Sequence, residues 1–235
     1  MAPLALAPPD CRPTRGYDCY EKGSLIVAPR PDKSSAKTKI LNAALTIIRA
    51  KGYAATTVDD LCAASDVTKG AFFHHFKSKV EVAVAAAVHW SKVTSELFEG
   101  AAYHGQADPL ERVLGYLEFR KQLLTGDVAE FTCLVGTMVQ ETFASSPAIR
   151  AACEASISGH AAKIEADIAE AMRQRGLRTE WTAKSLALHT QAVLQGAFIL
   201  AKATDDAKIA AGSIDHLRRY IECLFNPASQ KGKRS

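Results

Sequence analysis

The sequence predicts an all-α protein with a small N-terminal domain of three helices and a larger C-terminal helical domain. Apolar residues recur at spacings of three and four from Ser34 onward, and no alternation of apolar and polar residues is long enough to indicate a strand. Residues that can cap a helix precede most of these segments. With 235 residues, 48% hydrophobic and 23% charged, the chain has the composition of a globular protein and the length for two unequal domains.

The first 33 residues differ from the rest, because they are rich in proline and lack helical periodicity. We expect a disordered arm over residues 1–33. Its basic residues are thinly spread, which favours an incidental tail over an arm that enters a minor groove. The first helix is then expected from about Ser35 to Lys51, with Gly52 as its stop. Its apolar stripe is Leu41, Ala44, Leu45 and Ile48.

Two very short helices follow, separated by a turn of about four residues. Thr57 can cap a helix that begins at Val58, and Asp60 lies at its third position, where a carboxylate favours the positive helix end. Residues 64–67 break this helix, and Thr68 can cap the next one. This pattern is typical of a helix-turn-helix, whose second helix enters the DNA major groove with its N-terminal residues against base edges.

The charge of this segment suits double-stranded DNA as a partner. Between Ser34 and Lys79 lie seven Lys or Arg residues and three Asp residues, so the segment carries 7 − 3 = +4, the net charge of the whole chain. We therefore expect a helix-turn-helix DNA-binding domain over residues 34–80, with Phe72 and Phe76 turned inward. A nonspecific DNA-compacting protein would normally carry a larger basic excess.

Three segments carry a family resemblance: Ile40–Tyr53, Thr56–Leu61 and Val67–Lys79, of which the last, V-T-K-G-A-F-F-H-H-F-K-S-K, is the most specific. Together they resemble the DNA-binding domain of the tetracycline-repressor (TetR) family of bacterial transcription regulators. The sequence departs from the family at two positions. Phe73 stands where relatives usually carry Tyr, and Asp66 occupies a turn position often filled by Gly. Asp tolerates a positive φ better than most residues, so the turn survives.

The first turn of the second short helix carries the residues expected to read bases. Lys69 can donate to guanine, Gly70 lets the backbone approach closely, and the methyl of Ala71 can contact a thymine methyl. The resemblance implies phosphate contacts for Phe73, His75 and Lys79, with His74 compensating for the missing Tyr hydroxyl, and Thr57 is a further phosphate candidate. The predicted DNA-binding set is Thr57, Thr68, Lys69, Gly70, Ala71, Phe73, His74, His75 and Lys79.

The rest of the chain reads as a series of long helices that form a ligand-binding and dimerisation domain over residues 81–226. A capping box at Ser78–Glu81 opens the helix that links the two domains, and Asp108-Pro109 opens the next. A basic flexible tail is expected over residues 227–235. The expected helices run from about 79 to 103, 109 to 126, 129 to 144, 147 to 176, 180 to 203 after a Thr179 cap, and 206 to 225.

The last two long helices are expected to form a homodimer interface, because each has a wide apolar stripe and Gly196 allows close approach. Paired with their symmetry mates they would form a four-helix bundle, which the family resemblance also implies. The alternative is that both stripes face the core of their own chain. The stripes comprise Leu186, Val193, Leu194, Ala197, Phe198 and Ala201, and Ile214, Leu217, Tyr220, Ile221 and Leu224.

The family resemblance implies a small-molecule effector that enters the C-terminal domain and releases the protein from DNA. Aromatic and sulfur-containing side chains suit a mostly apolar ligand, although for each residue taken alone a place in the core is favoured over ligand contact. Cys133 opens the segment C-L-V-G-T-M-V-Q-E, which resembles a TetR subgroup that includes sensors of reactive electrophiles. A thiol at a helix N-terminus would be more acidic, whereas small buried cysteines are common. The ligand-binding candidates are Trp90, Tyr116, Phe119, Cys133, Met138, Phe143 and His189.

Several other classes of protein are disfavoured. No apolar run reaches the length of a bilayer span and the N-terminus lacks a basic region, so we expect a cytoplasmic protein without membrane contact. The six cysteines form no C-x-x-C pair, and Cys62 and Cys223 are expected in the core. The neighbouring His74 and His75 diverge by about 100°, so they do not share one ion. We expect no metal, cofactor or catalytic set.

These observations favour a homodimeric repressor that an effector releases from a palindromic operator. The alternative is an all-α enzyme or small-molecule-binding protein with a vestigial helix-turn-helix.

Overall fold

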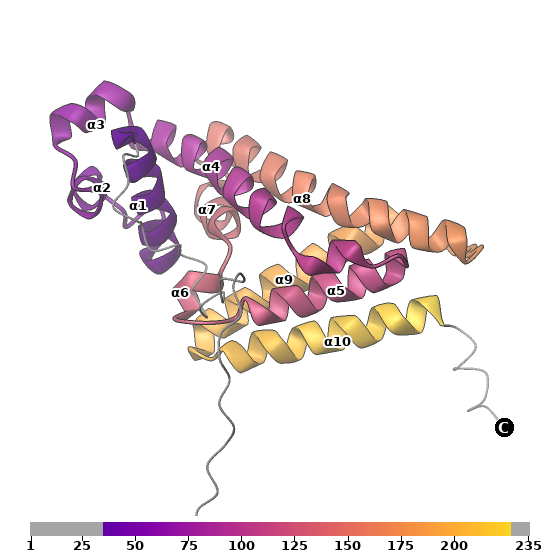
Figure 1. The fold of residues 1–235 in the computed structure, drawn as a ribbon. Helices are drawn as coiled ribbons and strands as arrows, with labels where there is room; N and C mark the ends of the chain where they lie inside the picture. Colours follow the sequence, from indigo (N-terminus) through magenta and orange to yellow (C-terminus); the bar gives the residue numbers. More distant parts are fainter. Residues whose placement is uncertain (1–34, 227–235) are drawn as a thin grey trace, which may run out of the picture.

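The computed structural model describes residues 35–226 and confirms the all-α prediction, since these residues form helices and no strand (Figure 1). The predicted arm (1–33) and basic tail (227–235) lie outside the described residues. No helix in the described part has both the length and the apolar character to cross a bilayer. The elements are α1 (Ala36–Lys51), α2 (Val58–Ser65), α3 (Lys69–His75), α4 (Lys79–Glu99), a 3-10 turn η1 (Ala102–Gly105), α5 (Pro109–Gln122), α6 (Val128–Phe131), α7 (Leu134–Thr142), α8 (Pro147–Gln174), α9 (Ala183–Thr204) and α10 (Ala207–Phe225).

The three N-terminal helices lie at one end of an elongated molecule, and α4 leads from them into the larger domain (Figure 1). There α4 packs along α8, α8 along α9, and α9 along α10, while α5 lies between α8 and α10. The end of α1 is covered by α6 and α7. The helix-turn-helix is therefore attached to the larger domain by the continuous chain into α4 and by packing of α1 against α4, α6 and α7.

Local capping forms the helix-turn-helix as predicted. The Thr57 hydroxyl accepts a hydrogen bond from the N–H of Asp60 (3.1 Å), and the Asp60 carboxylate accepts one from the N–H of Thr57 (2.7 Å), which completes a capping box. Asp66 ends α2 in the left-handed conformation, with φ at 52°. Thr68 then caps α3 by accepting from the N–H of Ala71 (3.2 Å). Short-range signals are thus sufficient to set both helix ends.

Three helix ends differ from the sequence predictions. The linking helix α4 stops at Glu99, and a 3-10 turn follows instead of a continuation to residue 103. α5 ends at Gln122, with Gly126 in the loop beyond at φ 75°. α9 is capped by Thr182, which accepts from the N–H of Ser185, whereas the predicted cap Thr179 donates to the carbonyl of Trp181.

The helix predicted over residues 129–144 is in fact two helices, α6 and α7, which meet at Thr132–Cys133. Phe131 is buried in the core of the larger domain, whereas Leu134 is buried in the second core beneath the helix-turn-helix. The break lets the chain turn between these two residues, so that each side chain is buried in a different core. Cys133 consequently becomes the N-cap of α7.

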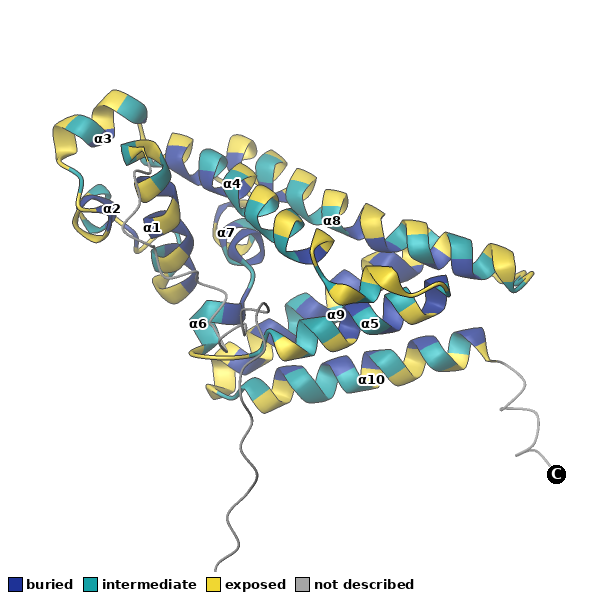
Figure 2. Cartoon of the chain, in the orientation of Figure 1, coloured by how far each residue is buried: buried dark blue, intermediate teal, exposed yellow. Residues whose placement is uncertain are grey.

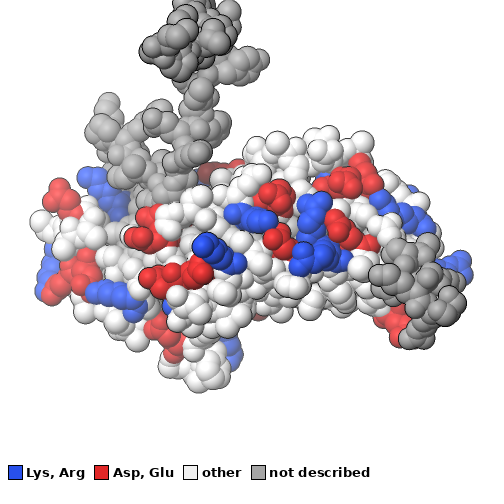
Figure 3. Space-filling model, turned by 90° about the horizontal axis from the view of Figure 1, so that it is seen from below, with Lys and Arg blue, Asp and Glu red and all other residues white. Residues whose placement is uncertain are grey.

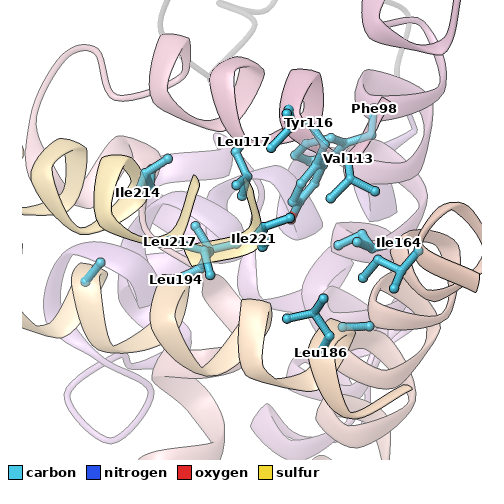
Figure 4. Close-up of a cluster of buried hydrophobic side chains, with 14 of the residues drawn as sticks. Phe98, Val113, Tyr116, Leu117, Ile164, Leu186, Leu194, Ile214, Leu217 and Ile221 are labelled. Carbon is cyan, nitrogen blue, oxygen red and sulfur yellow. The ribbon is translucent and has the colours of Figure 1, made fainter. Parts of the chain in front are cut away.

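Two hydrophobic cores hold the fold together. The larger core joins α4, α5, α8, α9 and α10 around residues such as Leu117, Leu194 and Ile221 (Figure 4). The second core buries Phe72 and Phe76 together with residues of α1, α4, α7 and α8, which confirms that both phenylalanines point inward. This second core crosses the domain boundary that we expected after residue 80. Cys62 is buried as predicted, but Cys223 is exposed on α10.

The stripes predicted for dimerisation mostly face the core of their own chain, as the alternative interpretation had it (Figure 2). Among them only Tyr220 is exposed, and the others belong to the larger core or pack against it. Both helices also carry apolar side chains on their opposite, outer sides. These exposed residues are Leu188, Ile199 and Leu200 on α9, and Ile209 and Tyr220 on α10.

Candidate DNA-binding surface and internal cavity

The outer face of α3 is open to solvent. Thr68, Lys69 and Gly70 at its start are exposed, and so are Phe73 and His74, while Ala71 and His75 are half-buried. On the inner face, the fully buried Phe72 anchors the helix, with the Phe73 ring edge-on to it at 5.2 Å. The predicted base-reading residues and most of the predicted phosphate-contacting residues therefore share one exposed surface.

Lys69 is held in place by an ion pair with Asp59 of α2, with Nζ 2.7 Å from Oδ1. The hydrogen bond to this carboxylate raises the pKa of Lys69, so the side chain is charged at neutral pH. Both side chains are exposed, and exposed pairs are weak because water and salt screen them. Lys69 can therefore exchange Asp59 for a base edge or a phosphate. A Cβ at Gly70 would meet only the Thr68 hydroxyl, at 3.9 Å, so the surface at Gly70 is unobstructed.

Two predicted phosphate contacts already have partners within the protein. The N–H and hydroxyl of Thr57 both donate to Asp60. The ammonium of Lys79 donates to the carbonyls of Tyr53 (3.1 Å), Ala54 (3.3 Å) and Thr56 (3.0 Å) and lies over the Tyr53 ring. Sequence reasoning missed this structural use of Lys79, because it depends on how α4 meets the loop of residues 52–57, here called the α1–α2 loop.

The same loop is held from its other side by Glu141 of α7. The N–H groups of Tyr53 and Ala54 donate to the Glu141 carboxylate at 3.1 and 2.6 Å. Gly52, at φ 87°, brings the loop so close that a Cβ on it would overlap this carboxylate. The amides of the α1–α2 loop are thus satisfied by the larger domain and its carbonyls by α4.

The end of α1 is tied to the larger domain by a buried arginine. Arg49 donates through Nη1 to the carbonyl of Glu130 (2.5 Å), and its guanidinium lies over the Trp90 ring. Burial lowers the pKa of Arg49 from its ordinary, very high value. Lys202 of α9 donates to the Arg49 carbonyl (3.0 Å) and to the hydroxyl of Thr137 (3.1 Å). Helices α6 and α9 therefore contribute polar contacts to this end of α1, and α7 binds the same Lys202.

A cavity of about 190 Å³ lies inside the larger domain. Among the predicted ligand-binding residues, Trp90 and Cys133 line it. Its polar lining was not anticipated, because single polar residues on mostly apolar helices carry no sign of which neighbours they will face. The lining includes Trp90, Ser91, Thr94, Phe98, Arg120, Phe131, Cys133, Ser156, His160, Lys163, Gln191 and Gln195.

The other predicted ligand-binding residues lie outside this lining. Tyr116 faces a smaller adjoining hollow of about 40 Å³, and its hydroxyl hydrogen-bonds with His160 (3.0 Å). Phe119 packs edge-on against Phe98. Met138 is fully buried in the second core. Phe143 and His189 are on the surface.

The positions of Phe143 and His189 contradict the prediction that they line a ligand pocket. Phe143 follows the last residue of α7 and is 60% exposed. His189 lies on the outer side of α9, where its ring contacts Tyr220 of α10 at 5.3 Å. Both residue types suit a pocket, but the helical phase that turns them outward depends on the packing partners of each helix.

The surface charge is mixed in the view from the α10 side, where Lys and Arg alternate with Asp and Glu (Figure 3). This pattern matches the modest net charge of +4. This face therefore presents no uniformly basic surface.

Comparison with known proteins agrees with this geometry. The family described as "Bacterial regulatory proteins, tetR family" matches residues 40–86, and the "Transcriptional regulator LmrA/YxaF-like, C-terminal domain" matches residues 109–209. A transcriptional regulator, AcuR, from Cereibacter sphaeroides is 30% identical over 122 residues, covering 52% of this chain and 56% of AcuR, so the match spans about half of that relative.

Two solved structures share the fold. A TetR transcriptional regulator from Chloroflexus aurantiacus superposes with a TM-score of 0.70 at 24% identity, covering 80% of this chain and 94% of that one. A cysteine mutant of the TetR-family regulator CifR, determined with double-strand operator DNA, superposes with a TM-score of 0.65 at 19% identity, covering 81% and 98%.

An exposed recognition helix on a helical domain with an internal cavity defines a DNA-binding transcriptional regulator. The chain belongs to the TetR family of bacterial regulatory proteins.

Replacing Gly52 tests the α1–α2 loop. Gly52→Ala should lower the free energy of unfolding by about 1–3 kcal/mol, because a side chain is strained at φ 87° and its Cβ would displace the Glu141 carboxylate. Urea unfolding followed by circular dichroism, at one protein concentration, measures this. Gly70→Ala is the matched control, since its Cβ has open space. Equal urea midpoints for the two variants would contradict the expectation.

Acid titration tests the burial of His160. Burial, with Arg120 nearby, lowers its pKa to about 3, so folded His160 stays neutral where the unfolded chain, with a pKa of about 6.5, takes up a proton. The unfolded state then binds more protons, and stability should fall as pH drops from about 7 to 5, with a slope of at most about 1.4 kcal/mol per unit from this group. His160→Gln should reduce the slope, whereas His216→Gln, on the surface, should not. An unchanged slope in His160→Gln would refute this.

Proposed function

We propose that this protein is a homodimeric repressor that binds a palindromic operator and is released when a small molecule enters the internal cavity. The observation that carries the proposal is the exposed start of α3, where Lys69 and Gly70 present an unobstructed surface above the buried Phe72 anchor. A protein that had lost DNA binding would have no requirement for this arrangement. The function is regulatory and not enzymatic, and it is exercised in the cytoplasm, where the DNA is.

The outer faces of α9 and α10 support a dimer. Leu188 and Ile199 on α9 and Ile209 and Tyr220 on α10 leave apolar surface exposed on adjacent helices. Small residues lie between the large ones on α9, including Gly196, around which a Cβ would meet nothing within 4 Å. Two copies can therefore approach closely across a two-fold axis. A dimer also presents two α3 helices, which suits two half-sites of a palindrome.

Helix α7 offers a direct connection from the cavity to the DNA-binding domain. Its N-cap, Cys133, lines the cavity, and Glu141 near its other end binds the α1–α2 loop. Trp90 also lines the cavity and stacks on Arg49 of α1. Suppose that α7 and Trp90 can each adopt two positions and that the ligand binds one arrangement more tightly. The ligand will then shift the equilibrium toward that arrangement, and the orientation of the helix-turn-helix will change with it. When the distance between the two α3 helices of the dimer changes, they no longer fit into successive major grooves of the DNA.

The effector is a small molecule with a mostly apolar or electrophilic character. Trp90, Phe98 and Phe131 supply apolar walls to the cavity. The Cys133 sulfur, which accepts from the N–H of Gly136 at 3.4 Å, is half-buried there and can be reached by a molecule in the cavity. Covalent modification of this thiol would be one way to bias α7.

Operator binding tests the proposal. Fluorescence anisotropy with the DNA upstream of the gene should give tight binding, and Lys69→Ala should weaken it by about 1–3 kcal/mol, roughly 5- to 150-fold in Kd. Binding to random DNA should change much less. Lys92→Ala, an exposed lysine on α4, is the control for loss of one charge. If neither this fragment nor a genome-wide selection yields DNA that the wild type prefers, the proposal fails.

A charge on the outer face of α9 tests the dimer. Ile199→Asp should halve the mass measured by light scattering, because it places a carboxylate in an apolar interface, and should weaken operator binding by about a hundredfold or more through loss of the second half-site. Val88→Asp on α4 is the control, as Val88 is even more exposed, at 64% against 47% for Ile199. A monomeric wild type, or a dimeric Ile199→Asp variant, would disprove this interface.

A further inference from the structure

Arg120 on α5 places a cation in the lining of the cavity. Its Nε donates to the Tyr116 hydroxyl at 3.0 Å, and among the described residues no carboxylate pairs with it. Two other cations of α5 have carboxylate partners: Arg112 binds Asp167, and Lys121, the residue after Arg120, binds Asp215. Arg120 differs from both, because it lines the cavity and donates to a phenol.

The surroundings of Arg120 are aromatic. The guanidinium carbon lies 4.7 Å from the centroid of Phe98, 5.6 Å from Tyr116 and 6.0 Å from Phe198. Aromatic faces attract a cation but do not replace the hydrogen bonds that its N–H groups made in water. Since Nε is engaged, Nη1 and Nη2 are left to donate, and a planar guanidinium presents such donors in a geometry that matches a carboxylate.

The other ionisable groups of the cavity do not supply this anion. Lys163, at the rim, is itself a cation and already binds Glu99 (2.6 Å) and Ser95 (3.0 Å). His160 is a neutral ring that shares the Tyr116 hydroxyl with Arg120. The cavity therefore carries a positive charge at Arg120 that neither Lys163 nor His160 compensates.

The size and walls of the cavity limit the ligand. An engineered protein cavity of about 150 Å³ holds benzene, so about 190 Å³ admits a ring of that size with a small substituent. Trp90, Phe98 and Phe131 form flat apolar walls for such a ring, and Gln191 and Gln195 add amide groups beside them. A large anion would not fit this volume, and a multiply charged anion would need more than the one cation that Arg120 supplies.

We propose that the cavity binds a small monocarboxylate, with the carboxylate on Arg120 and an apolar body of about benzene size against Trp90, Phe98 and Phe131. This rests on the proposed function and deepens it by naming the chemical class of the effector. Arg120 selects the anion, and the aromatic walls select the size and shape of its body.

Two pairs of probes test the site: benzoate with benzamide, and hexanoate with hexanamide. In each pair the molecules are nearly isosteric and only one is charged. Calorimetric titration of the full-length protein, free of DNA, should give at least one carboxylate that binds about tenfold or more tightly than its amide. Arg120→Gln should remove this preference and leave amide binding within about twofold, while Arg120→Lys should retain part of it.

Lys163→Gln is the matched control, since it removes a cavity cation that already has a carboxylate partner, and it should change carboxylate affinity less than about threefold. Cys133→Ser should have as little effect, because these probes are not electrophiles. Circular dichroism and retained operator binding establish that each variant is folded. Equal binding of acid and amide, undiminished carboxylate binding by Arg120→Gln, or binding of none of the four probes would overturn the proposal.

Operator release, measured separately by anisotropy, distinguishes this inference from the function on which it rests. If a carboxylate binds through Arg120 but operator DNA stays bound, the ligand class holds and the effector role fails. If the wild type binds no operator at all, the regulatory proposal fails, while the calorimetric comparison still decides the role of Arg120.

Discussion

The α1–α2 loop is the constraint on which the arrangement of the two domains depends. A loop that leaves a helix at a positive φ exposes amides and carbonyls that need partners. Here the amides of Tyr53 and Ala54 find the carboxylate of Glu141, and the carbonyls find the ammonium of Lys79. One partner belongs to α7 and the other to α4, so a movement of the loop relative to either helix breaks hydrogen bonds that hold it in place.

This arrangement makes α7 a short rigid element between two sites. The helix spans only Leu134 to Thr142, with Cys133 at the cavity before it and Glu141 at the loop near its end. Met138, midway along it, is fully buried in the core that also contains Phe72, the anchor of the recognition helix. A contiguous set of packed and hydrogen-bonded groups therefore lies between the cavity and the α1–α2 loop.

The sequence predicts best what is decided within a few residues. The caps at Thr57 and Thr68, the left-handed Asp66 and the stop at Gly52 are local signals, and the structure confirms them. The sequence predicts less well which side of α9 faces the core, because this helix has apolar residues on its inner side, at Leu194, and on its outer side, at Ile199. The break before α7 requires two separate cores, and the surroundings of Arg120 depend on the side chains that α4, α6, α7, α8 and α9 bring to the cavity. Neither can be read from spacing along the chain.

The ion pair between Lys69 and Asp59 also affects how this protein would compete with salt. A lysine that moves from water to a phosphate releases a counterion from DNA, and the salt dependence of affinity counts these events. A lysine that is paired with an aspartate must first leave it, and the freed carboxylate then takes up a cation from solution. This uptake offsets part of the counterion release from the DNA. For this protein, the slope of affinity against salt concentration will therefore undercount the basic side chains that lie on the DNA.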